Sequence, residues 1–386
     1  MVKQSIGRDQ SYARVVNNDL VIQHLRNRNL SATELAHMLN LSHAALSSIL
    51  KGLLQEGIIK VSTSISRAGK GRKQVCYTLN EEYGLIVVVS LSDNRYKISI
   101  SNIKEEILVE QEKEIDRYDV AIIYEIVLCI KQLVSSNLYR DIPIRQIIIA
   151  VPGRVNSHTH ELQLSKQFDS DLFEEKNRII SIFENHFNVP IQMQNDINLS
   201  IIGEIRSGGL TNVENAMLAY VDNGIGAAFV FDGKLYDGDS GYAGELGLMQ
   251  TSFKGQESYL DEFVSLRSIK NYASNHFNRV FHVRDLLGEY AKKGELYEYI
   301  NETAHVLGKK LRDIIELLNI SHIVLSGRIT QFGEDYLNCI RDETSKSQNN
   351  CVVKFSMLSK SSILIGAMSK SVDQSISHDL VKKVSL

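Results

Sequence analysis

The stretch from residue 217 to residue 265 constrains the fold of this 386-residue chain more than any other. It begins with a short apolar run, Met217–Tyr220, of the kind that forms a buried strand, and Ala227–Phe231 supplies a second such run. Asp232 and Gly233 then make a two-residue turn, because glycine tolerates the positive φ of a tight hairpin. The sequence therefore predicts a strand pair and a hairpin, followed by a glycine-rich loop.

One carboxylate in that loop lies between small residues. Glu245 follows Ala243 and Gly244 and precedes Leu246 and Gly247. Small flanking residues let a backbone approach a ligand closely, while the charged group accepts hydrogen bonds from it. Glu245 is therefore a candidate ligand-binding residue.

This stretch resembles the ROK family of sugar kinases and sugar-responsive repressors. In that family a glycine-rich turn and a hairpin precede Ala-Gly-Glu-x-Gly-His, a zinc-binding cysteine loop and Cys-Leu-Glu. Residues 243–247 match the first pattern, Leu248 stands at the histidine position, and residues 259–261, Tyr-Leu-Asp, align with Cys-Leu-Glu. The cysteines of the zinc loop are absent, so we expect neither a metal nor a cofactor.

Length and composition indicate an ordinary globular protein of two or three domains. No apolar run reaches transmembrane length, and no signal sequence opens the chain, so we expect a cytoplasmic location. The four cysteines are far apart in the sequence and are interpreted as reduced thiols.

The charge is unevenly distributed. Residues 1–80 hold 11 Lys and Arg against 4 Asp and Glu, whereas the remainder holds 32 against 42. A basic N-terminal segment on an otherwise acidic chain indicates that this segment meets a polyanion.

The N-terminal segment carries the pattern of a winged helix-turn-helix. Residues 1–16 are polar and expected to be loosely ordered, and a helix is predicted to begin near Asp19. Ser31 and Glu34 form a capping box at the start of a second helix, and Ser42 can cap a third, from His43 to about Gln55. Strands at 58–61 and 74–79 flank a basic loop, which predicts the wing.

Two groups of residues are the candidate DNA contacts. The third helix exposes short or basic side chains suited to base edges and phosphates in a major groove, and the loop supplies cations for the phosphate backbone. The first group is His43, Ala44, Ser47, Ser48 and Lys51, and the second is Arg67, Lys70, Arg72 and Lys73.

For the rest of the chain the resemblance implies an α/β fold, namely the two-lobed, actin-like and ribonuclease H-like fold of the sugar kinases. We expect the DNA-binding domain at 1–80, the N-terminal lobe at 81–196, and the C-terminal lobe at 197–386 with the ligand site and dimer surface. Helices are predicted at 121–135, 173–187, 265–277, 283–292, 296–318 and 363–370.

The resemblance also proposes a sugar site. Residues 195–198, Asn-Asp-Ile-Asn, match the family's Asn-Asp-x-Asn, whose Asp is the catalytic base of the kinases. The site residues implied are Asn195, Asp196, Glu245 and Asp261. A helix cap is the other interpretation of Asn195 and Asp196.

The family's nucleotide elements are altered in three places. The first phosphate turn is Ser92-Asp93-Asn94-Arg95 and contains no glycine, the second opens with Asp222-Asn223, and residues 325–328, Leu-Ser-Gly-Arg, keep one glycine of the pair near the adenosine. Acidic side chains oppose phosphate binding there. We therefore expect no enzymatic activity.

Together these patterns predict a DNA-binding regulator of carbohydrate genes, of the repressor type. Its expected partners are operator DNA, a sugar or sugar derivative between the lobes, and a second copy of the chain. Two alternatives remain open: an active sugar kinase with an appended DNA-binding domain, since Asp196 is kept, and a constitutive DNA-binding protein whose lobes only dimerise.

Overall fold

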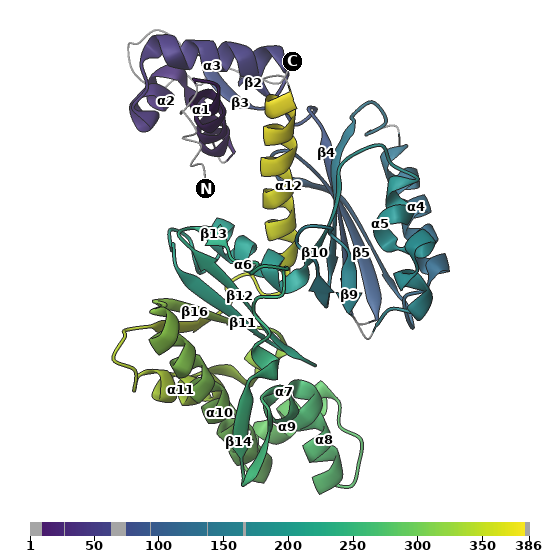
Figure 1. Ribbon diagram of the computed structural model, residues 1–386, viewed down its shortest axis with the longest axis vertical. Helices are drawn as coiled ribbons and strands as arrows, with labels where there is room; N and C mark the ends of the chain where they lie inside the picture. The colour runs from purple at the N-terminus through teal and green to yellow at the C-terminus, as the bar shows by residue number, and fades with distance from the viewer. Residues whose placement is uncertain are drawn as a thin grey trace, which may run out of the picture.

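The computed structural model describes residues 10–26, 28–62, 75–92, 94–136, 138–164 and 167–382. Three parts are visible in Figure 1: a small N-terminal domain and two lobes, each built on a sheet. The C-terminal helix α12 (Ser361–Lys382) runs from the region between the lobes to the small domain. Among the described residues, no helix has both the length and the apolar character needed to cross a bilayer.

The N-terminal domain has three helices and a three-stranded sheet in the order expected for a winged helix-turn-helix, and residues 63–74, where the wing is expected, lie outside the described residues. It comprises α1 (Gln10–Leu25), β1 (Leu30–Ser31), α2 (Ala32–Leu39), α3 (His43–Gln55), β2 (Ile59–Ser62) and β3 (Cys76–Leu79), with sheet order β1-β3-β2. The capping box is confirmed: Ser31 Oγ accepts from the backbone N–H of Glu34, whose carboxylate accepts from the N–H of Ser31 at 2.9 Å. Ser42 caps α3 without a reciprocal partner, its Oγ accepting from the backbone N–H of Ala45 at 3.2 Å.

The N-terminal lobe has a five-stranded sheet in the order β10-β7-β4-β5-β6. Strands β4, β5 and β6 form an antiparallel meander, and β7 and β10 extend it in parallel. One face of the sheet is covered by α4 and α5 (Figure 1). Its elements are β4 (Leu85–Ser92), β5 (Arg95–Asn102), β6 (Ile107–Glu114), α4 (Val120–Val134), β7 (Ile144–Val151), β8 (Arg154–Val155), β9 (Leu162–Leu164), α5 (Ile179–Glu184) and β10 (Ile191–Asn195).

The C-terminal lobe repeats this sheet plan, in the order β13-β12-β11-β16-β17. Again three strands are antiparallel and two extend the sheet in parallel, which is the expected actin-like arrangement. The strands are β11 (Ala216–Val221), β12 (Ile225–Phe231), β13 (Lys234–Leu235), β16 (His322–Ser326) and β17 (Val352–Phe355), with a separate hairpin of β14 (Gln250–Phe253) and β15 (Gln256–Tyr259).

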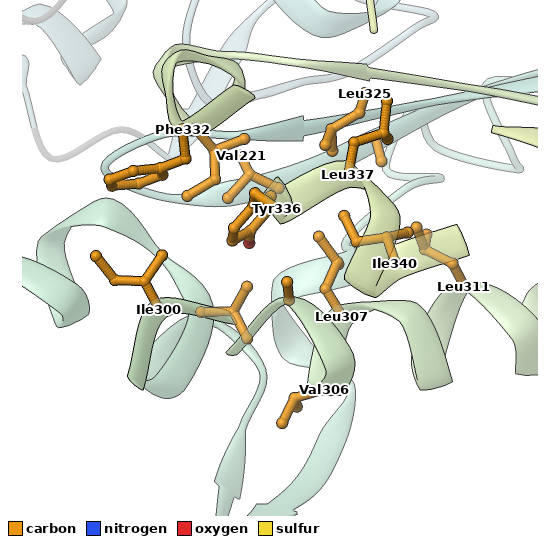
Figure 2. Close-up of a cluster of buried hydrophobic side chains, with 14 of the residues drawn as sticks. Val221, Ile300, Val306, Leu307, Leu311, Leu325, Phe332, Tyr336, Leu337 and Ile340 are labelled. Atoms are coloured by element: carbon orange, nitrogen blue, oxygen red, sulfur yellow. The ribbon is translucent and has the colours of Figure 1, made fainter. Parts of the chain in front are cut away.

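Helices α7 (Asp261–Val264), α8 (Leu266–His276), α9 (Val283–Tyr290), α10 (Glu295–Leu318) and α11 (Gly333–Thr344) complete the lobe. Figure 2 shows the core between the sheet and α10 and α11, where Tyr336 and Leu337 of α11 lie between Leu307 of α10 and Leu325 of β16. This core is fully buried and fixes the positions of the loops at the ends of β11 and β16.

Two helices lie between the lobes and belong to both. Helix α6 (Asp196–Ser207) packs Ile201 on the face of the C-terminal sheet opposite α10 and α11, while α12 packs Ala367 and Val372 on the face of the N-terminal sheet opposite α4. Their backbones touch. A β-carbon on Gly366 would lie 1.9 Å from the carbonyl oxygen of Leu199, and one on Gly203 would lie 2.1 Å from that of Ser362.

The buried carboxylate of Glu204 ties the two helices together further. It accepts from the backbone N–H of Gly209 at 2.7 Å and from that of Leu358, in the loop before α12, at 3.2 Å, and it contacts Ser356 Oγ. Because backbone contact and a satisfied buried charge both resist sliding, α6 and α12 behave as one unit.

The N-terminal domain shares its hydrophobic core with the N-terminal lobe. Val21 and Leu25 of α1 belong to one buried cluster with Ile86 of β4 and with Met368 and Val372 of α12. The N-terminal domain is therefore docked through α12 and is not joined only by a linker.

Four features differ from the sequence expectations. Helix α1 begins at Gln10, so the expectation of loose order up to residue 16 is wrong from there on, because a helix packed at one end extends readily through polar residues. The helix expected at 173–187 is limited to α5. Glu174 and Arg178 adopt extended backbones that separate the 3₁₀ turns Ser170–Phe173 and Glu175–Asn177 from it. Helix α12 is much longer than 363–370, and α11 had not been predicted.

Candidate functional site

Asn195 lies where β10 ends and α6 begins. Its side-chain oxygen accepts from the backbone N–H groups of Ile197 and Asn198 at 2.9 and 3.0 Å, and its amide nitrogen donates to the carbonyl of Gly153 at 2.9 Å. The carboxylate of Asp196 accepts from the N–H of Ile197 at 2.9 Å. The helix-cap interpretation is thus correct for Asn195, and the same bonds hold the two polar side chains at the junction of the lobes.

Glu245 faces the other lobe. Arg154 Nε, on β8 of the N-terminal lobe, donates to Glu245 Oε1 at 3.0 Å. The two side chains are 34% and 41% exposed, and the hydrogen bond from Arg154 to Glu245 raises the pKa of the guanidinium. Arg154 was not among the site residues predicted from the sequence, although it directly follows Gly153, whose carbonyl accepts from Asn195.

Asp261 begins α7 and forms an ion pair with Arg267. Two of the glycines in the strand-and-loop region lie against it: a β-carbon on Gly247 would be 3.3 Å from Asp261 Cβ, and one on Gly224 would be 3.7 Å from Asp261 Oδ1. The absence of a side chain at these positions lets the loop that carries Glu245 approach α7 closely.

The structure thus brings the predicted site residues into one neighbourhood. Asn195 and Glu245 are linked through residues 153 and 154, and Glu245 and Asp261 through Gly247. Leu248, at the family's histidine position, is half exposed beside them. The site therefore presents an amide, three carboxylates, the guanidinium groups of Arg154 and Arg267 and an apolar side chain, which is a set suited to a polyhydroxylated ligand.

A second group of contacts between the two lobes lies beside this site. The hairpin of β8 and β9 meets the loop at residues 239–242. Ser157 N–H donates to Ser240 O at 3.3 Å, His158 Nε2 lies 2.9 Å from Asp239 O, and Gln163 contacts the Tyr242 hydroxyl. Together with Arg154 and Glu245, these contacts hold the loop of one lobe to the hairpin of the other.

The position of the second phosphate turn is occupied by an ion pair. Arg328 Nε donates to both carboxylate oxygens of Asp222 at 2.9 Å, and the backbone N–H of Arg328 donates to Oδ2 at 3.1 Å. Gly327, just before it, has a positive φ, and a β-carbon there would lie 2.2 Å from Val221 O. A carboxylate already paired with a guanidinium is a poor receptor for phosphate.

A backbone group of the first phosphate turn is also bonded internally. The backbone N–H of Ser92 donates to the hydroxyl of the fully buried Tyr118 at 2.9 Å, and that hydroxyl donates to Arg95 O at 2.5 Å. Asp93 lies outside the described residues. The backbone N–H of Ser92 is therefore already bonded inside the protein.

The candidate DNA-contacting residues of α3 share one surface. His43, Ala44, Ser47, Ser48 and Lys51 are all exposed, while Leu46, Ile49 and Leu50 of the same helix are buried. Arg67, Lys70, Arg72 and Lys73 lie outside the described residues. Over the described part of the chain, no three His, Cys, Asp or Glu side chains are grouped as metal ligands.

Comparison with known proteins gives one consistent result. A family model described as the ROK family matches residues 94–369. The xylose repressor of Bacillus spizizenii is 23% identical over 353 residues, covering 87% of this chain and 88% of the repressor. The DNA-binding transcriptional dual regulator NagC of Escherichia coli K12 is 22% identical, covering 82% of each chain.

Solved structures share the fold over two different lengths. The crystal structure of a ROK family transcriptional regulator, a homolog of the E. coli MLC protein, covers 96% of this chain with a TM-score of 0.80 at 19% identity. A ROK family glucokinase from Streptomyces griseus, in complex with glucose and AMPPNP, covers 74% of this chain and 99% of its own, with a TM-score of 0.59 at 18% identity.

Proposed function

The chain belongs to the ROK family, and from that premise we propose that it is a DNA-binding transcriptional repressor controlled by a sugar bound between its lobes. The observation that carries the proposal is the share of the chain that each kind of relative matches. Glucokinase-type relatives match about three quarters of the chain over nearly their whole length, whereas the regulators match beyond that to include the winged domain.

The DNA-binding part of the proposal assigns DNA recognition to residues 1–80. The exposed side chains of α3, His43, Ala44, Ser47, Ser48 and Lys51, would enter a major groove, with Arg67, Lys70, Arg72 and Lys73 on the phosphate backbone. A dimer would place two such helices about one helical turn of DNA apart, or a multiple of it. Such a protein acts in the cytoplasm, where bacterial DNA is.

The ligand part assigns the lobes at 81–196 and 197–386 to sugar binding. Asn195, Asp196, Glu245 and Asp261 would accept from and donate to the hydroxyl groups, as carboxylates and amides do in sugar sites. The names of the relatives suggest xylose and N-acetylglucosamine as the first candidates to test. The ligand relieves repression only if it binds the arrangement released from DNA more tightly than the DNA-bound one.

A kinase activity is the second candidate, favoured by Asp196, which occupies the position of the family's base. Two features oppose a kinase activity, both at positions where the family's kinases bind phosphate. The carboxylate of Asp222 is paired with Arg328, and the backbone N–H of Ser92 is already bonded inside the protein. We therefore propose that the protein is not an enzyme.

A thermal-shift screen tests both candidates. The purified protein is heated with D-xylose, N-acetyl-D-glucosamine, D-glucose or ATP, because a ligand that binds only the folded state raises the melting temperature. We expect a shift with one sugar, no shift with ATP, and loss of the sugar shift in Glu245→Ala. A shift with ATP, together with sugar phosphorylation that Asp196→Asn abolishes, would establish the kinase instead.

The same sugar is then added to a complex of the protein with its upstream operator fragment, and the dissociation constant is measured by fluorescence anisotropy. We expect the sugar to weaken binding in the wild type and to leave Glu245→Ala unaffected. Tight DNA binding that no sugar alters would contradict the ligand part and leave the DNA-binding part standing.

A further inference from the structure

Arg26, at the end of α1, is buried where three parts of the molecule meet. Its side chain is only 3% exposed. One terminal nitrogen donates to Glu105, in the turn between β5 and β6, at 3.0 Å and to Ser369 of α12 at 3.3 Å, and the other contacts Asp373 of α12. A cation buried to this degree is stable only when its partners stay in place.

The partners of Arg26 are held in turn by α6. Arg206 Nε, at the end of α6, donates to the second oxygen of Glu105 at 3.3 Å. Arg26, Glu105, Arg206 and Asp373 thus form a four-charge network, which we call the Arg26 network. It contains two cations and two anions and joins the DNA-binding domain, the N-terminal lobe and the α6–α12 unit.

The other end of the α6–α12 unit lies at the candidate ligand site. Asn195 and Asp196 stand at the first turn of α6, about 15 Å along the helix from Arg206. On α12, Lys370 Nζ donates to Gln194, the residue before Asn195, at 2.9 Å, while Asp373, three residues further, contacts Arg26. Both helices therefore reach from the ligand site to the Arg26 network.

We propose that Arg26 is the positioning residue through which the state of the ligand site reaches the DNA-binding domain. Apolar packing between α1 and α12 is non-directional and tolerates small shifts, whereas the planar guanidinium fork fixes distance and angle to its partners. Movement of the α6–α12 unit must then carry α1 with it. The proposal rests on the proposed function, since it assigns a route to the regulation claimed there.

One detail supports a role beyond stability. Arg26 Nε is buried and has no hydrogen-bond partner among the described residues, so the network is incompletely satisfied in this arrangement. Native proteins pair nearly all of their buried donors, so this unpaired N–H distinguishes the Arg26 network from a purely stabilising ion-pair cluster.

Hydrogen exchange on the full chain tests the route without sugar or DNA. Asn195→Ala removes the cap of α6 and loosens its first turn. We expect amide exchange in α1, residues 17–25, to rise about threefold, because the loosened helix is tied to Arg26. In an Arg26→Gln background the same change should leave α1 unaffected while still raising exchange in α6, and Arg26→Lys, which keeps the charge, should restore part of the transmission.

The matched control removes a cap that has no tie to Arg26. Asp119 caps α4 in the N-terminal lobe, accepting from the N–H of Ile122 at 2.8 Å. Asp119→Ala should leave exchange in α1 unchanged in both backgrounds. If Arg26→Gln fails to fold, as judged by far-ultraviolet circular dichroism, the double variant Glu105→Gln, Asp373→Asn replaces it with the same expectation.

The proposal is overturned if Asn195→Ala leaves α1 unchanged in the wild type, or raises its exchange equally with and without Arg26. The first result would mean that the two ends are not coupled, and the second that apolar packing alone couples them. Because the experiment uses neither ligand nor operator, its failure is distinct from failure to find a sugar or a DNA site.

Discussion

Arg328 holds both carboxylate oxygens of Asp222 at 2.9 Å, at the position where the family's kinases have a phosphate-binding turn. The pair comes from the ends of two neighbouring strands, β11 and β16, so the sheet itself positions it. Binding of a nucleotide there would require the carboxylate to lose its partner next to an incoming anion.

Breaking the Asp222–Arg328 pair should destabilise the protein. Asp222 is nearly buried, so Arg328→Ala leaves a charge with little water, and we expect the free energy of unfolding to fall by about 2–3 kcal/mol. Urea denaturation measures the change. Arg95→Ala, which breaks an exposed pair with Glu112, should cost under about 1 kcal/mol, and an equal loss in both variants would contradict this reading of the pair.

The crossing of α6 and α12 should not tolerate a methyl group. In Gly366→Ala the new carbon would lie 1.9 Å from Leu199 O, so the two helices must move apart. We expect the free energy of unfolding, measured by thermal denaturation, to fall by more than about 3 kcal/mol. Gly288, in α9, has no atom within 4 Å of such a carbon. Gly288→Ala should be stabilising by about 0.5–1 kcal/mol through helix propensity, so equal effects at the two glycines would refute the close-packed crossing.

Lys51 on the exposed face of α3 should contact a phosphate or base edge. Lys51→Gln is expected to weaken binding to duplex DNA and to reduce the slope of log K against log salt concentration by about 1. Titrations at several salt concentrations provide the slope. Lys292→Gln, an exposed lysine of the C-terminal lobe, is the control. An unchanged slope in Lys51→Gln would remove α3 from the DNA interface.

The ionisation of Glu81 should make the free energy of unfolding depend on pH. Burial raises the pKa of its carboxyl, but hydrogen bonds from Lys60 of β2 and from Lys104 outweigh that effect and lower the pKa to about 2. A lowered pKa in the folded state contributes stability above the unfolded value, near 4.5, and that contribution is lost as the pH falls towards 2.

The stability difference between the wild type and Glu81→Gln should therefore be constant from pH 7 to about 5 and shrink below pH 4.5. Since Glu81 is more than a third exposed, we expect a difference of only about 1 kcal/mol at pH 7. Urea midpoints at pH 7, 4 and 3 measure it. A difference that grows as the pH falls would contradict the assignment.

The sequence was informative where a local rule decides the structure. Two such predictions are confirmed, the capping box of Ser31 and Glu34 and the turn at Asp232 and Gly233. Both turn residues have a positive φ. The extent of α12 was not predictable in this way. Its second half is held by the sheet of the N-terminal lobe and by α1, which are hundreds of residues away in the chain.

The candidate site shows the same division. Family motifs located Asn195, Asp196, Glu245 and Asp261, and the structure brings them together, although their roles remain predictions. Arg154 and Arg328 were missed because their meaning depends on a partner from another strand or lobe, Glu245 and Asp222 respectively. No spacing of residues in the sequence predicts a contact between side chains from different strands or lobes.

The route taken by α12 has a consequence for synthesis. The winged domain leaves the ribosome first, whereas the helix against which it docks follows after roughly 300 further residues, which translation at about 5–20 residues per second takes tens of seconds to deliver. During that interval the growing chain already carries α3 but has neither α12 nor the complete Arg26 network. A nascent or prematurely terminated chain would therefore present a DNA-reading helix without the part of the molecule that positions it.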